Sequence, residues 1–316
     1  MIYHQQELFP NSIHHFIPVG DTEIYTRFTP APLKLVDKAP IVFMATGMHS
    51  NMDSAGNTAV AEFLRSHGYA TFQFNFMGCG EGDTRSKGHA EHDTITNGVL
   101  TTINAYEFMR EKYASVVDTS RASFYGNSYG ATLGTLAIGQ GLISPEAAVF
   151  NSPLTWGQWK PYKSLIRFSV RIAPGALAVL GLPLYRPMTE DVIANYMDAD
   201  NYMSKYLWKF GRTSAYFFTG AKDKKSNAKI ISDWVGQINT RSNPRDVFVG
   251  DKQAHFRSFD IKGGHDGGTP EMLNKFNENM IDFFSSVREA NNMLGKGGRY
   301  NLTINDKVRG MAVATR

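Results

Sequence analysis

One serine lies in a predicted tight turn that is flanked by glycines. Ser128 lies in GNSYG, between Gly126 and Gly130, and the short apolar run ASFY directly precedes the motif. The pattern G-x-S-x-G after a strand and before a helix predicts a sharp turn that exposes the serine hydroxyl at the carboxyl edge of a sheet. A Cβ at either glycine would collide with a neighbouring strand or helix. Ser128 is therefore a candidate nucleophile, and the alternative is a turn serine on an inactive scaffold.

Two other groups of reactive side chains are weaker candidates. His89, His92 and Asp93 lie together in GHAEHDT, and histidines three apart on a helix can share a metal ion. They fall at the junction of a loop and a helix, where Asp93 or Thr94 would serve as the helix cap. Cys79, the single cysteine, stands between two glycines and is interpreted as a buried or turn thiol. We predict no metal ion and no cofactor.

The elements that must position Ser128 alternate along the chain. Short apolar runs rich in β-forming residues predict strands, and helical patterns separate them. Strands are expected at residues 14–19, 23–28, 41–45, 69–76, 121–125, 147–153, 215–220 and 255–261, and helices at about 58–67, 93–113, 229–238 and 271–287, with one more directly after Ser128. The first two strands are expected to form an antiparallel pair. Buried apolar strands between helices favour an α/β fold with a mostly parallel central sheet covered by helices on both faces.

An insertion interrupts this alternation and divides the chain into three parts. Residues 1–153 and 213–290 form the expected core, residues 154–212 a helical cap, and residues 291–316 a basic, glycine-containing tail that is loosely attached. The cap holds Trp156 and Trp159. Its basic residues at 160, 163, 167 and 171 line one helical face, which is either a docking strip for an anionic acyl carrier or lipid headgroup, or a solvated surface. The apolar stretch after them is a lid, cap core, or a mixture of both.

In this context residues 13–287 resemble the α/β-hydrolase family. The resemblance implies an oxyanion hole after an early strand, an acid after a late strand and a histidine after the last strand. The early strand ends in FMATGMHSN, with Thr46-Gly47 where the family usually has His-Gly. The resemblance places one oxyanion N–H on Met48 and the other on Tyr129, with Gly47 beside the substrate. Because both donors are backbone groups, their side chains matter little.

The resemblance also implies the acid and the base. The late strand ends in FFTGAKDKKS, whose Gly-x-x-Asp turn makes Asp223 the candidate acid, and IKGGHDGGTP follows the last strand and makes His265 the candidate base. The order serine, acid, histidine is the one expected for this fold. The weaker rivals are His255 for the base, and Asp251 and Asp266 for the acid.

A glycine-rich segment between the early strands also matches the family. FNFMGCGEGDTRSKG, residues 74–88, resembles the family's D-x-R-G-x-G-x-S turn, with Asn75 and Met77 in place of the usual Asp and Arg. We interpret it as a structural turn near the site.

Composition and charge exclude several classes of function. The net charge of +4 is a property of the tail, where five basic residues face one acid beyond residue 290. The remainder is balanced and contains no nucleic-acid-binding motif, so we predict no nucleic-acid partner. No apolar stretch approaches the ~20 residues of a membrane span, and no signal peptide is apparent. A cytoplasmic protein without stable membrane insertion is expected, with its oligomeric state left open.

Three functions fit these residues. The first is a cofactor-independent serine hydrolase that cleaves carboxylic esters or thioesters, and the aromatic cap favours a small-molecule substrate with an apolar acyl or aryl group. The second is an acyltransferase that passes the same acyl-enzyme to an alcohol, thiol or amine. The third is a non-catalytic binding protein on the same fold.

Overall fold

The architecture is taken from a computed structural model of the chain. It describes residues 11–32, 38–48, 50–155, 195, 203, 205–207, 210–223, 225–241, 252–259 and 270–295.

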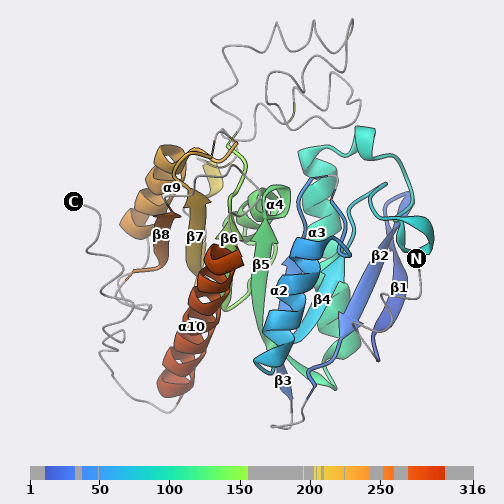
Figure 1. Ribbon diagram of the computed structural model, residues 1–316, viewed down its shortest axis with the longest axis horizontal. Helices are drawn as coiled ribbons and strands as arrows, with labels where there is room; N and C mark the ends of the chain where they lie inside the picture. Colours follow the sequence, from blue (N-terminus) through green and yellow to red (C-terminus); the bar gives the residue numbers. More distant parts are fainter. Residues whose placement is uncertain are drawn as a thin grey trace, which may run out of the picture.

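An eight-stranded sheet forms the centre of the protein (Figure 1). Its strands are β1 (Ile13–Val19), β2 (Thr22–Thr29), β3 (Ala39–Ala45), β4 (Ala70–Phe74), β5 (Val117–Asn127), β6 (Ala147–Asn151), β7 (Ser214–Gly220) and β8 (Ala254–Phe259). They lie in the order β1-β2-β4-β3-β5-β6-β7-β8. The β1–β2 and β2–β4 pairs are antiparallel and the other pairs parallel, which confirms the mostly parallel sheet.

The order of the strands reverses around β3. From β3 the chain moves to β4 on one side and then returns to β5 on the other. The loops that follow β3 and β5 therefore leave the sheet in opposite directions at the carboxyl ends of these two strands. Ligands of open α/β sheets bind at such a switch point.

Helices cover both faces of the sheet. They are α2 (Ala55–Ser66), α3 (Ile95–Tyr113), α4 (Tyr129–Gly139), α9 (Ala228–Arg241) and α10 (Pro270–Gly295), with short 3₁₀ turns at Gly82–Thr84 and Ala90–His92. Figure 1 shows α2 and α10 on the near face, and α3 and α4 behind the sheet. Neighbouring residues of β3 pack into opposite cores: Phe43 faces the core of α3, α4 and α9, whereas Val42 and Met44 face that of α2 and α10. Burying each such side chain stabilises the fold by about 2–3 kcal/mol.

Several element boundaries differ from the expected ones for identifiable reasons. Helix α3 begins at Ile95 because Thr94 is its cap: the Thr94 hydroxyl accepts a hydrogen bond from the Asn97 N–H at 3.1 Å. Strand β5 begins at Val117, because Val117 and Asp118 pair with β3 ahead of the apolar run. Helix α10 continues to Gly295, into the expected tail, where the Asn291 side chain donates a hydrogen bond to Glu146 at 3.2 Å.

Most of the expected cap, including Trp156 and Trp159, lies outside the described residues, as does the tail beyond residue 295. The apolar residues Met203, Leu207 and Phe210 of the expected cap are described, and they are buried in the core of α3, α4 and α9. Across the described part of the chain, no helix combines the length and apolarity that a bilayer crossing requires.

A matched pair of glycines tests how tightly α4 packs on the sheet. A Cβ at Gly134 would lie 2.2 Å from the ring of Phe124, whereas a Cβ at the exposed Gly236 of α9 would meet nothing within 4 Å. Gly134→Ala is expected to lower the free energy of unfolding by about 1–3 kcal/mol, since overpacking outweighs the better helix propensity of alanine. Gly236→Ala is expected to raise it by about 0.5–1 kcal/mol. Urea unfolding measures both, and a Gly134→Ala variant as stable as the unmodified chain would contradict the packing.

Candidate active site

Ser128 occupies a backbone conformation that side-chain-bearing residues rarely adopt. It is the single residue between the end of β5 and the start of α4, with φ 52° and ψ −111°. This combination lies outside the regions favoured by L-residues and costs about 1–3 kcal/mol, so the surrounding structure must impose it. The Ser128 N–H donates a hydrogen bond to the Asn151 carbonyl at 2.8 Å, which ties the turn to the end of β6. The strained turn expected from G-x-S-x-G is therefore present.

The two glycines of the motif allow this turn to form. A Cβ on Gly130 would lie 2.4 Å from the Ala45 carbonyl oxygen, and one on Gly126 would lie 2.7 Å from the Ala131 Cα. Neither neighbour can move aside, because both are backbone atoms of packed elements. The Gly130 N–H also donates a hydrogen bond to the Thr46 carbonyl at 2.9 Å. The start of α4 is thus held directly against the residues that follow β3.

The expected oxyanion residues lie around Ser128. The Cβ position of Gly47 is 3.6 Å from the Ser128 Cβ, so the loop after β3 passes beside the serine and continues into Met48. Tyr129 is the first residue of α4 and lies at the positive end of its dipole, which favours negative charge. The structure thus brings Gly47 and Tyr129 next to Ser128, and the role of the Met48 and Tyr129 N–H groups as oxyanion donors stays a prediction.

Asp223 follows β7 at the same edge of the sheet. Its N–H donates a hydrogen bond to the Gly220 carbonyl at 3.1 Å, so the Gly-x-x-Asp segment is a turn. One carboxylate oxygen, Oδ1, accepts hydrogen bonds from the Lys225 and Ser226 N–H groups at 2.8 and 3.1 Å, and the residue is 7% exposed. The Ser226 hydroxyl in turn donates to the Ser152 carbonyl beyond β6 at 2.7 Å. The carboxylate is therefore held in one orientation two strands from Ser128.

His265, the expected base, lies outside the described residues, as do the rival acids Asp251 and Asp266. The rival base His255 is described, and its position argues against it. It is the second residue of β8 and pairs with Tyr216, near the amino end of β7. Since β8 is three strands from β5 and neighbouring strands are ~4.8 Å apart, its backbone is laterally ~14 Å from that of Ser128.

The role of Asp93 was not predicted from the sequence. The sequence suggests a metal ligand or a helix cap at Asp93, but its side chain instead accepts a hydrogen bond from the Tyr129 hydroxyl at 3.3 Å. That hydroxyl is also 3.3 Å from the Thr94 carbonyl. The side chain fits because Gly98 has no Cβ, since a Cβ there would lie 2.5 Å from the Tyr129 hydroxyl oxygen. Burial raises the pKa of Asp93 to about 8, against the opposing effect of the Tyr129 hydrogen bond. A neutral carboxyl at the start of α3 thus helps to hold the residue after Ser128.

The geometry gives less support to a metal site at His89 and His92 or to a reactive thiol at Cys79. The rings of His89 and His92 are 6.0 Å apart, and within the described residues no three metal-binding side chains come together. Cys79 is buried, as expected for a structural thiol.

Comparison with known proteins identifies the architecture. No protein-family model matches the chain, and no curated protein matches it by sequence. Solved structures do match: the Pyrococcus furiosus esterase Pf2001 has a TM-score of 0.65 and 14% identity over 89% of this chain and 92% of its own. Est1E from Butyrivibrio proteoclasticus, with ferulic acid bound, has a TM-score of 0.59 and 15% identity over 86% and 99%.

The chain has the α/β-hydrolase fold. The mouse α/β hydrolase domain-containing protein 10 shares it, with a TM-score of 0.59 and 17% identity over 87% of this chain and 99% of its own. The α/β-hydrolase fold expected from the G-x-S-x-G context is thereby confirmed. At these identities the likeness concerns the fold, and the roles of the individual residues rest on the geometry described above.

The buried carboxyl of Asp93 should make stability depend on pH. Its pKa rises from 3.8 in the unfolded chain to about 8 in the fold, so between these values the folded state binds one more proton. This lowers the free energy of unfolding by up to about 1.4 kcal/mol for each unit of rising pH. Asp93→Asn keeps an acceptor for Tyr129 without titrating, and should therefore remove that part of the slope.

Urea unfolding of both proteins at pH 5, 6, 7 and 8 measures the difference. Asp233→Asn, at an exposed carboxylate of α9, is the control for the same chemical change at the surface. Parallel curves for the unmodified chain and Asp93→Asn would contradict a neutral buried carboxyl.

Proposed function

We propose that the protein is a serine hydrolase that cleaves carboxylic esters or thioesters through an acyl-Ser128 intermediate. The observation that carries the proposal is the strained backbone of Ser128 at the switch point of the sheet. Strain of this kind persists where the surrounding structure imposes it, and such residues cluster at active sites. A serine that only terminated β5 would have no need of this conformation.

The mechanism assigns one role to each residue. His265 takes the proton from the Ser128 hydroxyl, which attacks the carbonyl carbon of the ester or thioester. Asp223 holds the imidazole in the required tautomer and stabilises its protonated form. The N–H groups of Met48 and Tyr129 stabilise the oxyanion, a contribution of about 3–4 kcal/mol for each donor. The leaving group takes the proton from His265, and water activated by the same histidine then releases the acid.

The substrate class follows from the expected cap and from the neighbours. Trp156 and Trp159 are proposed to contact an apolar acyl or aryl group above Gly47. The ferulic acid bound to Est1E is an aromatic carboxylic acid, the kind of product that this proposal expects. Transfer of the acyl group to an alcohol competes with hydrolysis at the same intermediate, so the ratio of the two products in a water–alcohol mixture distinguishes a hydrolase from an acyltransferase.

Ser128→Ala is the decisive variant for this function. It should abolish labelling by a fluorophosphonate probe and lower the rate of p-nitrophenyl ester hydrolysis by at least about 10⁴-fold, because no acyl-enzyme can form. Ser123→Ala is the matched control, since Ser123 is a buried serine of the same strand that lies before the turn. It should keep both the labelling and the activity.

The assay uses esters of rising chain length, with acyl thioesters alongside, and mass spectrometry to locate the label. Full activity in Ser128→Ala would rule out the mechanism. A folded, unmodified chain that takes up no label would instead support a non-catalytic binding protein.

A further inference from the structure

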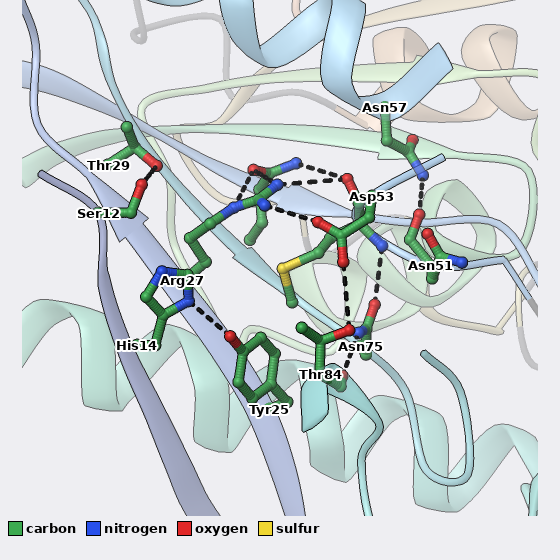
Figure 2. Close-up of polar contacts among 12 residues, drawn as sticks. Ser12, His14, Tyr25, Arg27, Thr29, Asn51, Asp53, Asn57, Asn75 and Thr84 are labelled. Carbon is green, nitrogen blue, oxygen red and sulfur yellow. Dashed lines mark hydrogen bonds and ion pairs between the residues drawn. The ribbon is translucent and has the colours of Figure 1, made fainter. Parts of the chain in front are cut away.

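The loop after β3 has to be held still for Met48 to act. Residues 46–54 connect β3 to α2 and carry Gly47 and Met48. Loops between a strand and a helix are usually mobile, whereas a catalytic donor needs its position fixed to within about 0.5 Å. Buried side chains from outside the loop, among them those of Arg27, Asn57 and Asn75, contact its backbone or the carboxylate of Asp53 (Figure 2). Two of these three, Arg27 and Asn75, come from segments far away in the sequence.

Asn75 binds the loop with both ends of its amide. It directly follows β4 and is fully buried. Its Oδ1 accepts a hydrogen bond from the Met52 N–H at 2.8 Å, and its Nδ2 donates one to the Thr84 carbonyl at 2.8 Å. Only an amide supplies an acceptor and a donor in this geometry at neutral pH. The amide therefore explains why this chain has Asn where the family usually has Asp.

A buried ion pair holds the next residue of the loop. Arg27 of β2 and Asp53 have side chains only 4% and 7% exposed, and the Arg27 Nη1 is 2.6 Å from the Asp53 Oδ1. The guanidinium also donates to the Gln73 Oε1 at 2.8 and 3.2 Å, and the Thr84 hydroxyl donates to the other Asp53 oxygen at 3.2 Å. Figure 2 shows Arg27 reaching across to Asp53, with Thr84 on the far side of the carboxylate. A buried ion pair contributes little net stability, so its value lies in fixing one arrangement.

Asn57 holds the loop from the other side. It is the third residue of α2, is 5% exposed, and its Nδ2 donates a hydrogen bond to the Asn51 carbonyl at 2.8 Å. The Ser50 hydroxyl lies 3.5 Å from the same nitrogen. Asn51 lies three residues after Met48 in the same loop.

We propose that Asn57, Asn75 and the Arg27–Asp53 pair are positioning residues that fix the loop so that the Met48 N–H faces the oxyanion at Ser128. The inference rests on the proposed function. The contacts described for these side chains are with the loop and with Gln73 and Thr84 beside it, so we expect them to act on Met48 through the loop. They bind residues 51–53, the far end of the loop, while the Gly130 N–H binds its near end at Thr46.

Asn57→Asp tests the inference with almost no change in side-chain shape. A carboxylate in the first turn of α2 interacts favourably with the helix dipole, and that turn has no acidic residue now. The same carboxylate cannot donate to the Asn51 carbonyl and repels it, so the loop should shift. A displacement of ~1 Å at a catalytic group can cost ~100-fold, and we expect kcat for p-nitrophenyl butyrate to fall about 10- to 100-fold. KM should stay within about twofold, because ground-state binding is unchanged.

Asn75→Asp is the second variant, and it has a matched control. It removes the donor to the Thr84 carbonyl and should lower kcat in the same way. Asn239 makes the same two-way bridge far from the site: its Nδ2 donates to the Ala254 carbonyl at 2.8 Å and its Oδ1 accepts from the Ala254 N–H at 2.9 Å. Asn239→Asp makes the same chemical change there and should leave kcat unaltered.

Active sites are counted by fluorophosphonate titration, and kcat is expressed per titrated site. A purely structural role would lower the number of sites and not the turnover of each, whereas a positioning role lowers the turnover and weakens inhibition by phenylboronic acid in parallel. An unmodified chain whose Ser128 takes no label would overturn the proposed function and the inference with it. A labelled unmodified chain whose folded Asn57→Asp variant keeps full kcat would overturn the inference alone. If Asn75→Asp does not fold, kcat per titrated site of Asn57→Asp decides whether the inference holds.

Discussion

The contact between the start of α4 and the end of β3 is the constraint on which the site depends. The Gly130 backbone approaches the Ala45 and Thr46 carbonyls so closely that no Cβ fits between them. This approach forces the chain to reverse within one residue, and the strain falls on Ser128. It also joins the proposed nucleophile to the loop of the proposed oxyanion hole through the hydrogen bond from Gly130 to Thr46.

Buried polar groups extend this constraint on both sides of Ser128. On one side, the Tyr129 hydroxyl donates to the neutral carboxyl of Asp93 at the start of α3. On the other, Arg27 and Asp53 hold the loop after β3. Buried ion pairs are seldom the most stable choice for a protein interior. Asp93 contacts the residue after Ser128, and the Arg27–Asp53 pair contacts the loop that carries Gly47 and Met48, so we infer that both groups fix the geometry of these segments.

Sequence predicted local features well and tertiary ones poorly. Short apolar runs between helical patterns were sufficient to predict the mostly parallel sheet, because strands buried on both faces consist largely of apolar residues. GNSYG predicted the turn at Ser128, and Gly-x-x-Asp predicted the turn at Asp223. The pairing of Arg27 with Asp53 could not be predicted, since it depends on which strands become neighbours in the sheet.

The same limit applies to Asp93, whose position beside a helix start suggested a cap. Thr94 takes that role, and Asp93 turns inward to Tyr129 because the loop before α3 buries it. Boundaries were missed where polar residues pair, as at the start of β5. The proposed base His265 and the tryptophans of the expected cap lie outside the described residues, and their roles are proposals drawn from the resemblance and from the composition of the cap.

A crystal structure of the phosphonylated protein tests the central claim most directly, because it shows the tetrahedral adduct that the strained turn is held to receive. The account predicts phosphorus on the Ser128 Oγ, with its oxygen about 2.7–3.1 Å from the Met48 and Tyr129 nitrogens. It also predicts the His265 ring between the adduct and Asp223. Phosphorus on another residue, or an oxygen directed away from both nitrogens, would contradict it.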